Sequence, residues 1–221
     1  MPQPLSETDV MNRALARIGA GTISSPDEDS ALARQVTAVF DDCLEAALAA
    51  YAWNWARRSF ALQRLADPPV TGYAYAYAVP ADAVGEPLRL WSDAARKSPL
   101  RNHLFEARQV HCDDDAVFGS FVVRMEPEFW PALFRAAVID WIAARLAIPV
   151  GHDDKLAALL EQGAVGSPSD YMRGGLMGRA IGRDAASSAA QPLLASDPLT
   201  GARVDGAPSL GGWDYPFESH R

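Results

Sequence analysis

Cysteine is scarce in this sequence, and so is any long apolar run. The two cysteines, Cys43 and Cys112, lie far apart, which is not the spacing of a disulfide framework or of a structural zinc site. No apolar run approaches the length that spans a bilayer. The first residues lack the basic and apolar regions of a secretory signal. We therefore expect a chain that is made and kept in the cytosol and has no membrane partner.

Positive charge is scarce as well. The chain has 20 lysines and arginines against 28 aspartates and glutamates, a formal net charge of -8. A protein that binds duplex DNA by releasing counterions normally presents an excess of basic residues, so a direct grip on DNA is disfavoured. What the chain does contain is 49% hydrophobic residues over 221 positions. That is enough for one domain with a sizeable core plus extensions.

Helical signals dominate the first third of the chain. Ser6 and Asp9 have the spacing of a capping box, and apolar residues then recur every three or four positions until Gly19. A Ser-Pro pair at 25–26 predicts the start of a longer helix, which runs to the aromatic stretch Tyr51-Ala-Trp-Asn-Trp. The pattern remains compatible with a helix over 56–65.

The pattern then changes to a period of two. Tyr73, Tyr75 and Tyr77 alternate with alanines, which is strand spacing and places the three rings on one face. Short β-prone segments follow at 87–91, 107–111 and 118–125. We predict a small antiparallel sheet inserted between helices. It should project as a lobe whose tyrosine face is buried against a neighbouring subunit or the next ring of an assembly.

Helical spacing returns after the β-prone segments. A broad apolar face over 133–146, a short helix capped by Asp153 or Asp154, and a last helix over 179–190 are expected, whereas 191–221 has no apolar period. The predicted fold is therefore mainly α with a small antiparallel β insertion, an α+β fold. Its parts are a helical bundle core (1–69 and 126–190), an inserted β lobe (70–125) and an extended C-terminal arm (191–221).

Catalytic and ligand-binding motifs are nearly missing. His111 and Cys112 precede three aspartates, and a solvated turn explains this cluster better than a metal site, because adjacent side chains point in different directions. The glycines at 174–182 lack the lysine and hydroxyl residue of a phosphate-binding loop. The acids after His152 suit a helix start. We predict no catalytic residue, metal or cofactor. An unrecognised enzyme would have to use His111, Asp113 or Glu126.

An ordered series of features remains. An aromatic motif after the long helix is followed by a tyrosine motif and then by the β-prone segments and the apolar helix. The residues of the two motifs are Trp53, Asn54, Trp55 and Ala56, then Tyr75, Tyr77, Pro80 and Asp82. In order and spacing this series resembles the tail tubular protein A family, the head-to-tail adaptor (connector) proteins of short-tailed phages, and related adaptors of other tailed phages and gene transfer agents. The resemblance covers about residues 6–160.

The resemblance implies a structural virion protein rather than an enzyme. Such a protein is assembled in the host cytoplasm and sits at the head-tail junction as a ring of about twelve copies. Its partners would be the portal protein, neighbouring copies of itself, and the next tail component, a tail tube or nozzle. DNA would pass through the channel during ejection without sequence-specific binding. A cytosolic helical regulator or ligand-binding module remains the alternative.

The glycine-rich segment 163–179 departs from the family pattern. It stands where the resemblance implies one continuous last helix that ends in an Asp-Ala pair, and such a pair follows only at Asp184-Ala185. The course of the chain through this segment is therefore not predicted by the resemblance.

The large aromatic residues could serve several purposes. Trp53 and Trp55 are best explained by core packing, with packing between subunits or a platform for a ligand or nucleic acid as alternatives. In the tail, three rings alternate after a pair of leucines, which favours an arm that binds the portal or an adjacent subunit over one that packs on its own domain or stays disordered. The predicted partner-binding residues are Leu193, Leu194, Trp213, Tyr215 and Phe217.

Overall fold

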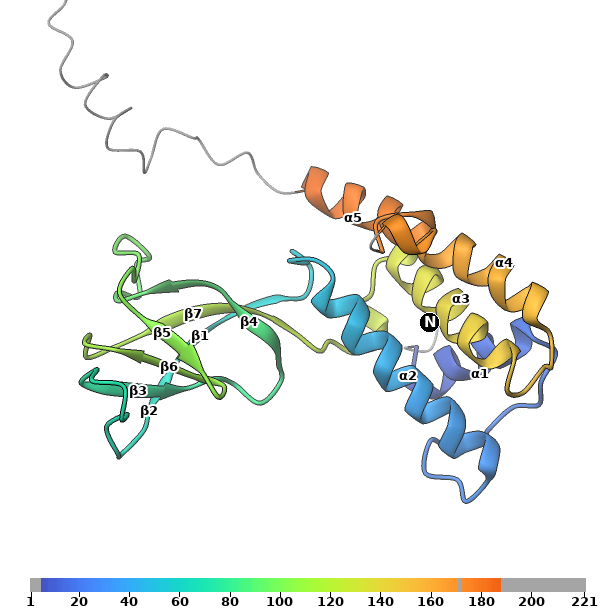
Figure 1. Cartoon of the computed structure of the whole chain (residues 1–221), viewed down its shortest axis with the longest axis horizontal. Coiled ribbons are helices and arrows are strands. Elements are labelled where there is room, and N and C mark those ends of the chain that lie inside the picture. Colours follow the sequence, from blue (N-terminus) through green and yellow to red (C-terminus); the bar gives the residue numbers. More distant parts are fainter. Residues whose placement is uncertain (1–4, 171, 188–221) are drawn as a thin grey trace, which may run out of the picture. The chain divides into compact units, whose positions relative to one another are not determined.

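The computed structural model describes residues 5–170 and 172–187, so the predicted arm and its partner-binding residues lie outside the described part. The first helix, α1 (Glu7–Arg17), begins as expected (Figure 1). The Ser6 hydroxyl accepts the backbone N–H of Asp9, and the Asp9 carboxylate accepts the backbone N–H of Ser6. This is the predicted capping box, and Gly19 follows the helix with a φ of 69°.

The second helix, α2 (Ala31–Ala49), is shorter than expected at both ends. Its N-cap is Ser30, whose hydroxyl accepts the backbone N–H of Ala33, and not the predicted Ser-Pro pair. Upstream, the Glu28 carboxylate accepts the backbone N–H and the hydroxyl of Ser24, which stabilises a separate turn. Because Ser30 provides a better-placed cap than the earlier serine, the helix starts five residues after Pro26.

The predicted helical continuation over 56–65 is wrong. This segment forms β1 (Arg57–Ala61) and β2 (Gln63–Arg64). A period of two was present there, because the half-buried Phe60 and the buried Leu62 alternate with exposed neighbours. Backbone pairing of β1 with residues 118–122, far away in the sequence, outweighs local helix propensity in this segment.

Three further helices complete the helical part. They are α3 (Ala132–Ala147), α4 (Asp154–Val165) and α5 (Gly175–Ser187), with single 3₁₀ turns at Pro127–Phe129 and Pro168–Asp170. Asp153 caps α4 by accepting the backbone N–H of Leu156, as predicted. The last helix starts four residues before the predicted 179.

Helix α3 lies at the centre of the helical part and packs against the other four helices (Figure 1). Most of its residues are buried, which explains why apolar residues cover an unusually broad face of this helix. Its inward side chains meet those of α1 and α2 in one apolar core. That core includes Val10, Leu15, Phe40, Phe134 and Ile142.

The remaining strands form two small antiparallel sheets (Figure 1). One sheet has the order β1-β7-β4 and the other β2-β3-β6-β5. Their bounds are β3 (Tyr75–Ala78), β4 (Ala83–Trp91), β5 (Leu104–Glu106), β6 (Gln109–Cys112) and β7 (Phe118–Val123). The predicted α+β class is confirmed, although the β region consists of two sheets and recruits β1 and β2.

Strand β7 faces two apolar cores. Phe121 and Val123 point into the core shared by the two sheets, whereas Val122 between them packs into the helical core. Because successive side chains of a strand point to opposite faces, one strand can contribute to both cores. The helices and the sheets of the described residues accordingly belong to one compact unit.

None of the helices in the described part of the chain combines the length and the apolar character that crossing a bilayer requires.

Candidate functional site

The aromatic motif lies just beyond the C-terminus of α2, at its contact with α3. Trp53 is fully buried, and its indole N–H donates to the Ala47 carbonyl at 2.9 Å, so the ring is fixed against the last turns of α2. Its ring meets those of Tyr51 and Phe134 edge to face, with centroids 5.2 and 5.0 Å apart. This geometry is favourable for aromatic pairs. Trp53 is therefore a core residue, as predicted.

Trp55 occupies a different position. It packs on Phe134 at a centroid distance of 4.8 Å but is only partly buried. The ring lines an open hollow of about 480 Å³ between the aromatic motif, the start of α3 and the end of α5. Its indole nitrogen is shielded from water and has no hydrogen-bond partner among the described residues. Trp55 thus presents ring surface to a concave, mostly apolar site.

Asn54, between the two tryptophans, contacts Asp184 near the end of α5. The backbone N–H of Asn54 donates to the Asp184 carboxylate at 2.9 Å, and its side-chain amide donates to the same carboxylate and to the Asp184 carbonyl at 3.0 Å each. Asp184 is one of few buried charged residues, at 8% exposure. Ser187 adds a hydroxyl donor to the same carbonyl. We call this group of contacts the Asn54–Asp184 clamp.

The clamp brings together two features that lie far apart in the sequence. The aromatic motif and the Asp-Ala pair at 184–185 are separated by 130 positions, yet they meet in the fold. Their connection could not be derived from spacing. The only sequence signal was that a polar Asn interrupts the aromatic run, which is typical of a buried polar group that has a specific partner.

The tyrosine motif lies in the sheets and does not join the aromatic motif. Tyr77 is buried and donates its hydroxyl to the Asp114 carbonyl at 2.6 Å, and burial raises its pKa. Tyr75 is half-buried under the Arg64 guanidinium, which lies 3.6 Å from the ring centroid. Tyr73 precedes β3 and is also half-buried. In the isolated chain the burial therefore decreases from Tyr77 to its two neighbours, and burial of the whole face in an assembly remains a prediction.

Pro80 and Asp82 complete this motif by fixing the turn between β3 and β4. The Pro80 carbonyl accepts the Arg108 guanidinium at 2.9 Å, and the Asp82 carbonyl accepts the backbone N–H of Arg124 at 3.2 Å. The Asp82 carboxylate lies 3.7 Å from the Arg58 guanidinium, an exposed pair that contributes little stability. Both residues are therefore structural.

Arg124 connects the β region to the helices and has no counterpart among the predicted site residues. Its guanidinium donates to Glu7 of α1 at 2.8 Å and to Asp41 of α2 at 2.9 Å. It also lies 5.6 Å from the centre of the Phe40 ring. Nothing in the sequence around this single arginine predicts that it contacts two helices.

Replacing Arg124 with methionine should lower the free energy of unfolding by about 1 kcal/mol, because two partly exposed ion pairs are lost while the aliphatic stem is kept. The difference from the native chain should shrink in high salt, which screens such pairs. Urea unfolding at low and high salt measures both effects. A loss that is independent of salt would contradict the ion-pair explanation.

The candidate catalytic residues do not form a site. His111 is buried, and its ring nitrogens lie within hydrogen-bond distance of Thr71 and Gln109. Asp113 instead accepts the backbone N–H of Ala74, and neither Asp113 nor Glu126 lines the hollow beside His111. In residues 5–170 and 172–187 no three potential ligands are grouped as a metal ion requires.

Both cysteines are buried and reduced. Burial raises the pKa of Cys43 to about 12 and also raises that of Cys112, so both remain thiols at neutral pH. Thiolates are the nucleophilic and metal-binding form. These side chains are therefore small apolar core residues.

No protein-family model matches the chain, and a search of curated proteins finds no match.

Proposed function

We propose that this chain is a structural head-to-tail adaptor of a tailed phage or phage-like particle. In this proposal it forms a ring beneath the portal, contacts the next tail component and lines part of the DNA exit channel. The proposal depends on the order of the two motifs and of the β-prone segments and apolar helix that follow them. It implies no cofactor and no catalytic residue.

The Asn54–Asp184 clamp is the observation that supports this proposal best. The resemblance implies one continuous last helix that ends in an Asp-Ala pair, and the glycine-rich segment 163–179 interrupts that pattern. In the structure, Asp184 of the last helix does bond to Asn54 of the aromatic motif. The Asp-Ala pair thus meets the aromatic motif despite the glycine-rich segment, and this contact between two features of the resemblance supports the proposal.

The charge balance also suits a channel wall. With a formal charge of -8, the chain as a whole repels phosphates at long range. A channel lined by such subunits would let a duplex slide instead of binding it. A ring structure with a strongly basic lumen would overturn this part of the proposal.

Mass measurement and negative-stain imaging test the proposed function directly. The full chain would be studied with and without the portal protein of the same particle. Rings, or collars bound to the portal, are the expected result. Small species that do not bind the portal would instead favour the alternative function, a cytosolic helical regulator.

Truncation after Ala190 tests the predicted arm. The shortened chain should keep its helicity, because the five helices of the described residues all end before that point. It should bind the portal at least about tenfold more weakly, because large aromatic anchors carry most of the energy of an interface. A chain with Trp213, Tyr215 and Phe217 all replaced by alanine should show the same retained helicity and the same weaker portal binding. Undiminished portal binding by the truncated chain would contradict the role given to the arm.

One observation favours the ligand-binding alternative. The hollow beside Trp55 is concave and mostly apolar, as small-molecule sites are. Replacing Trp55 with phenylalanine separates the two functions. It should leave portal binding unchanged if the chain is an adaptor, and it should abolish ligand-induced thermal stabilisation if the hollow is a binding site.

A further inference from the structure

An arginine-lined groove lies between α1 and α3, away from both motifs. It is an open hollow of about 490 Å³. We call it the arginine groove, and its lining residues are Arg13, Ala16, Arg17, Ala132, Arg135, Ala136 and Ile139. Its charge is unexpected on a chain with more acidic than basic residues.

Two of the three arginines have no acidic partner in the described part of the chain. Arg17 contacts Asp140 at 3.2 Å, whereas no described carboxylate lies within 4 Å of the Arg13 or Arg135 side chain. Arg13 acts on Asp9 only through a weak electrostatic effect that lowers the pKa of that carboxyl, after the stronger hydrogen bonds from Ser6. Guanidiniums that line a concave surface without partners indicate a site for negative charge.

The small side chains that line the groove would allow a helix to approach it. Three of the lining residues are alanines, two of them one helical turn apart on α3. Small side chains on a helix surface let another helix approach closely, and the long aliphatic stems of arginines can cover apolar surface beside it.

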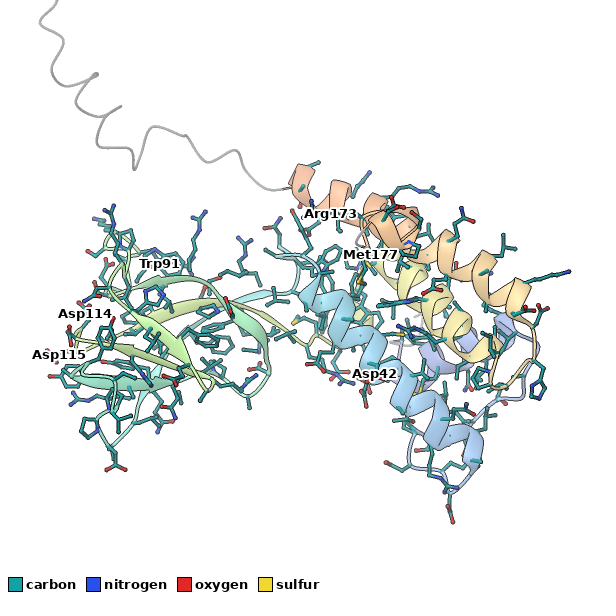
Figure 2. All side chains as sticks on the ribbon, viewed as in Figure 1. Asp42, Trp91, Asp114, Asp115, Arg173 and Met177 are labelled. Atoms are coloured by element: carbon teal, nitrogen blue, oxygen red, sulfur yellow. The ribbon has the colours of Figure 1, made fainter. Side chains whose placement is uncertain are left out.

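A matching surface exists on α2 of the same chain. Opposite its buried face, α2 carries an exposed stripe that we call the acidic α2 face, formed by Ala38, Asp42, Glu45 and Ala49. Figure 2 marks Asp42 on this helix. The four positions follow one another at steps of three or four, so they form a single row. The small residues at both ends leave the two carboxylates free to enter a groove.

Other acidic clusters fit the groove less well. Asp113, in the turn after β6, accepts the backbone N–H of Ala74, and Asp153 caps α4. Both carboxylates are therefore already engaged. Asp41 on α2 is engaged by Arg124. Asp42 and Glu45, in contrast, form no ion pair with any described residue.

We propose that the arginine groove receives the acidic α2 face of a second copy of this chain. The two surfaces differ and lie on different helices, so each copy offers one of each. Such head-to-tail contacts close into rings or continue as filaments. This inference deepens the proposed function by naming the contact between neighbouring subunits of the ring.

The contact can be tested by reversing the charge of each surface in a separate variant and then mixing the two variants. One variant carries Arg13→Glu and Arg135→Glu, the other Asp42→Arg and Glu45→Arg. Each variant alone brings like charges together at every contact and should self-associate at least about tenfold more weakly than the native chain. In an equal mixture, each reversed surface meets a complementary one, so association should return. Sedimentation velocity of native, single and mixed samples measures this.

A matched control reverses Arg101 and Lys155, which are exposed and lie outside the groove, to glutamate. This control changes the net charge as much as the groove variant does and should associate like the native chain. Circular dichroism and thermal melting exclude unfolding as the cause of any loss. The experiment contains no portal, so failure to bind a portal would overturn the proposed function and leave this contact intact.

Three results would overturn the contact. They are a native chain that stays monomeric up to about 1 mM, groove variants that associate normally, and a mixture that fails to recover. Normal association combined with a loss of duplex DNA binding in the groove variant would assign the groove to phosphates instead. In that case the interface between copies would lie elsewhere.

Discussion

Replacing Asp184 with alanine should lower the free energy of unfolding by about 2–4 kcal/mol. The substitution removes a buried carboxylate that accepts two hydrogen bonds from Asn54, and it leaves the donors of Asn54 without that acceptor. Unsatisfied buried donors are costly, and hydrogen bonds to charged groups are among the stronger ones. Urea denaturation followed by circular dichroism measures the loss.

Two further variants separate the clamp from a general effect of mutating α5. Asp184→Asn keeps an acceptor and should cost only about 1 kcal/mol. In a double-mutant cycle, the losses caused by Asn54→Ala and Asp184→Ala should add to more than the loss in the double variant, because both single changes remove the bond between the Asn54 side-chain amide and the Asp184 carboxylate. Strictly additive losses would show that the two side chains do not stabilise each other.

Replacing Trp53 with alanine should lower the free energy of unfolding by about 3–5 kcal/mol. The ring is fully buried against Tyr51 and Phe134, and its removal leaves a cavity that the surrounding core cannot fill. The bond from the indole to the Ala47 carbonyl is lost as well. Thermal unfolding followed by calorimetry is the suitable measurement.

Trp55 provides the matched control for Trp53. It belongs to the same motif and also contacts Phe134, but it is only partly buried and lines an open hollow. Trp55→Ala should therefore cost less than half as much as Trp53→Ala. Equal losses would mean that the two rings are equally important to the core, contrary to the difference in their burial.

Local signals in the sequence predicted the elements that depend on local chemistry. The capping box at Ser6 and the cap at Asp153 are confirmed, because a cap depends only on residues within one helical turn. The period of two around Tyr75 and Tyr77 likewise marked β3. The wide apolar face over 133–146 marked α3, whose central position makes most of its surface apolar.

Non-local pairing explains what could not be predicted. Residues 57–64 pair with β7 and β3. Because these partners lie far away in the sequence, the spacing of apolar residues within 57–64 does not reveal them. The same holds for the contact of Asn54 with Asp184 and for the bridge formed by Arg124. The arginine groove was equally hidden, because its arginines are spread over two helices that only the folded chain brings together.

The clamp has a consequence for the order in which the chain folds during synthesis. Asn54 leaves the ribosome long before Asp184, its partner 130 residues later, so the last contacts of the helical part must wait until nearly the whole described chain has emerged. The strands need no such delay. Their first and last segments already meet where the Val123 N–H donates to the Ala56 carbonyl, and the seven strands found in residues 5–170 and 172–187 all lie between Ala56 and Val123. The β region should therefore form first on the nascent chain, as a completed insert around which the helices close afterwards.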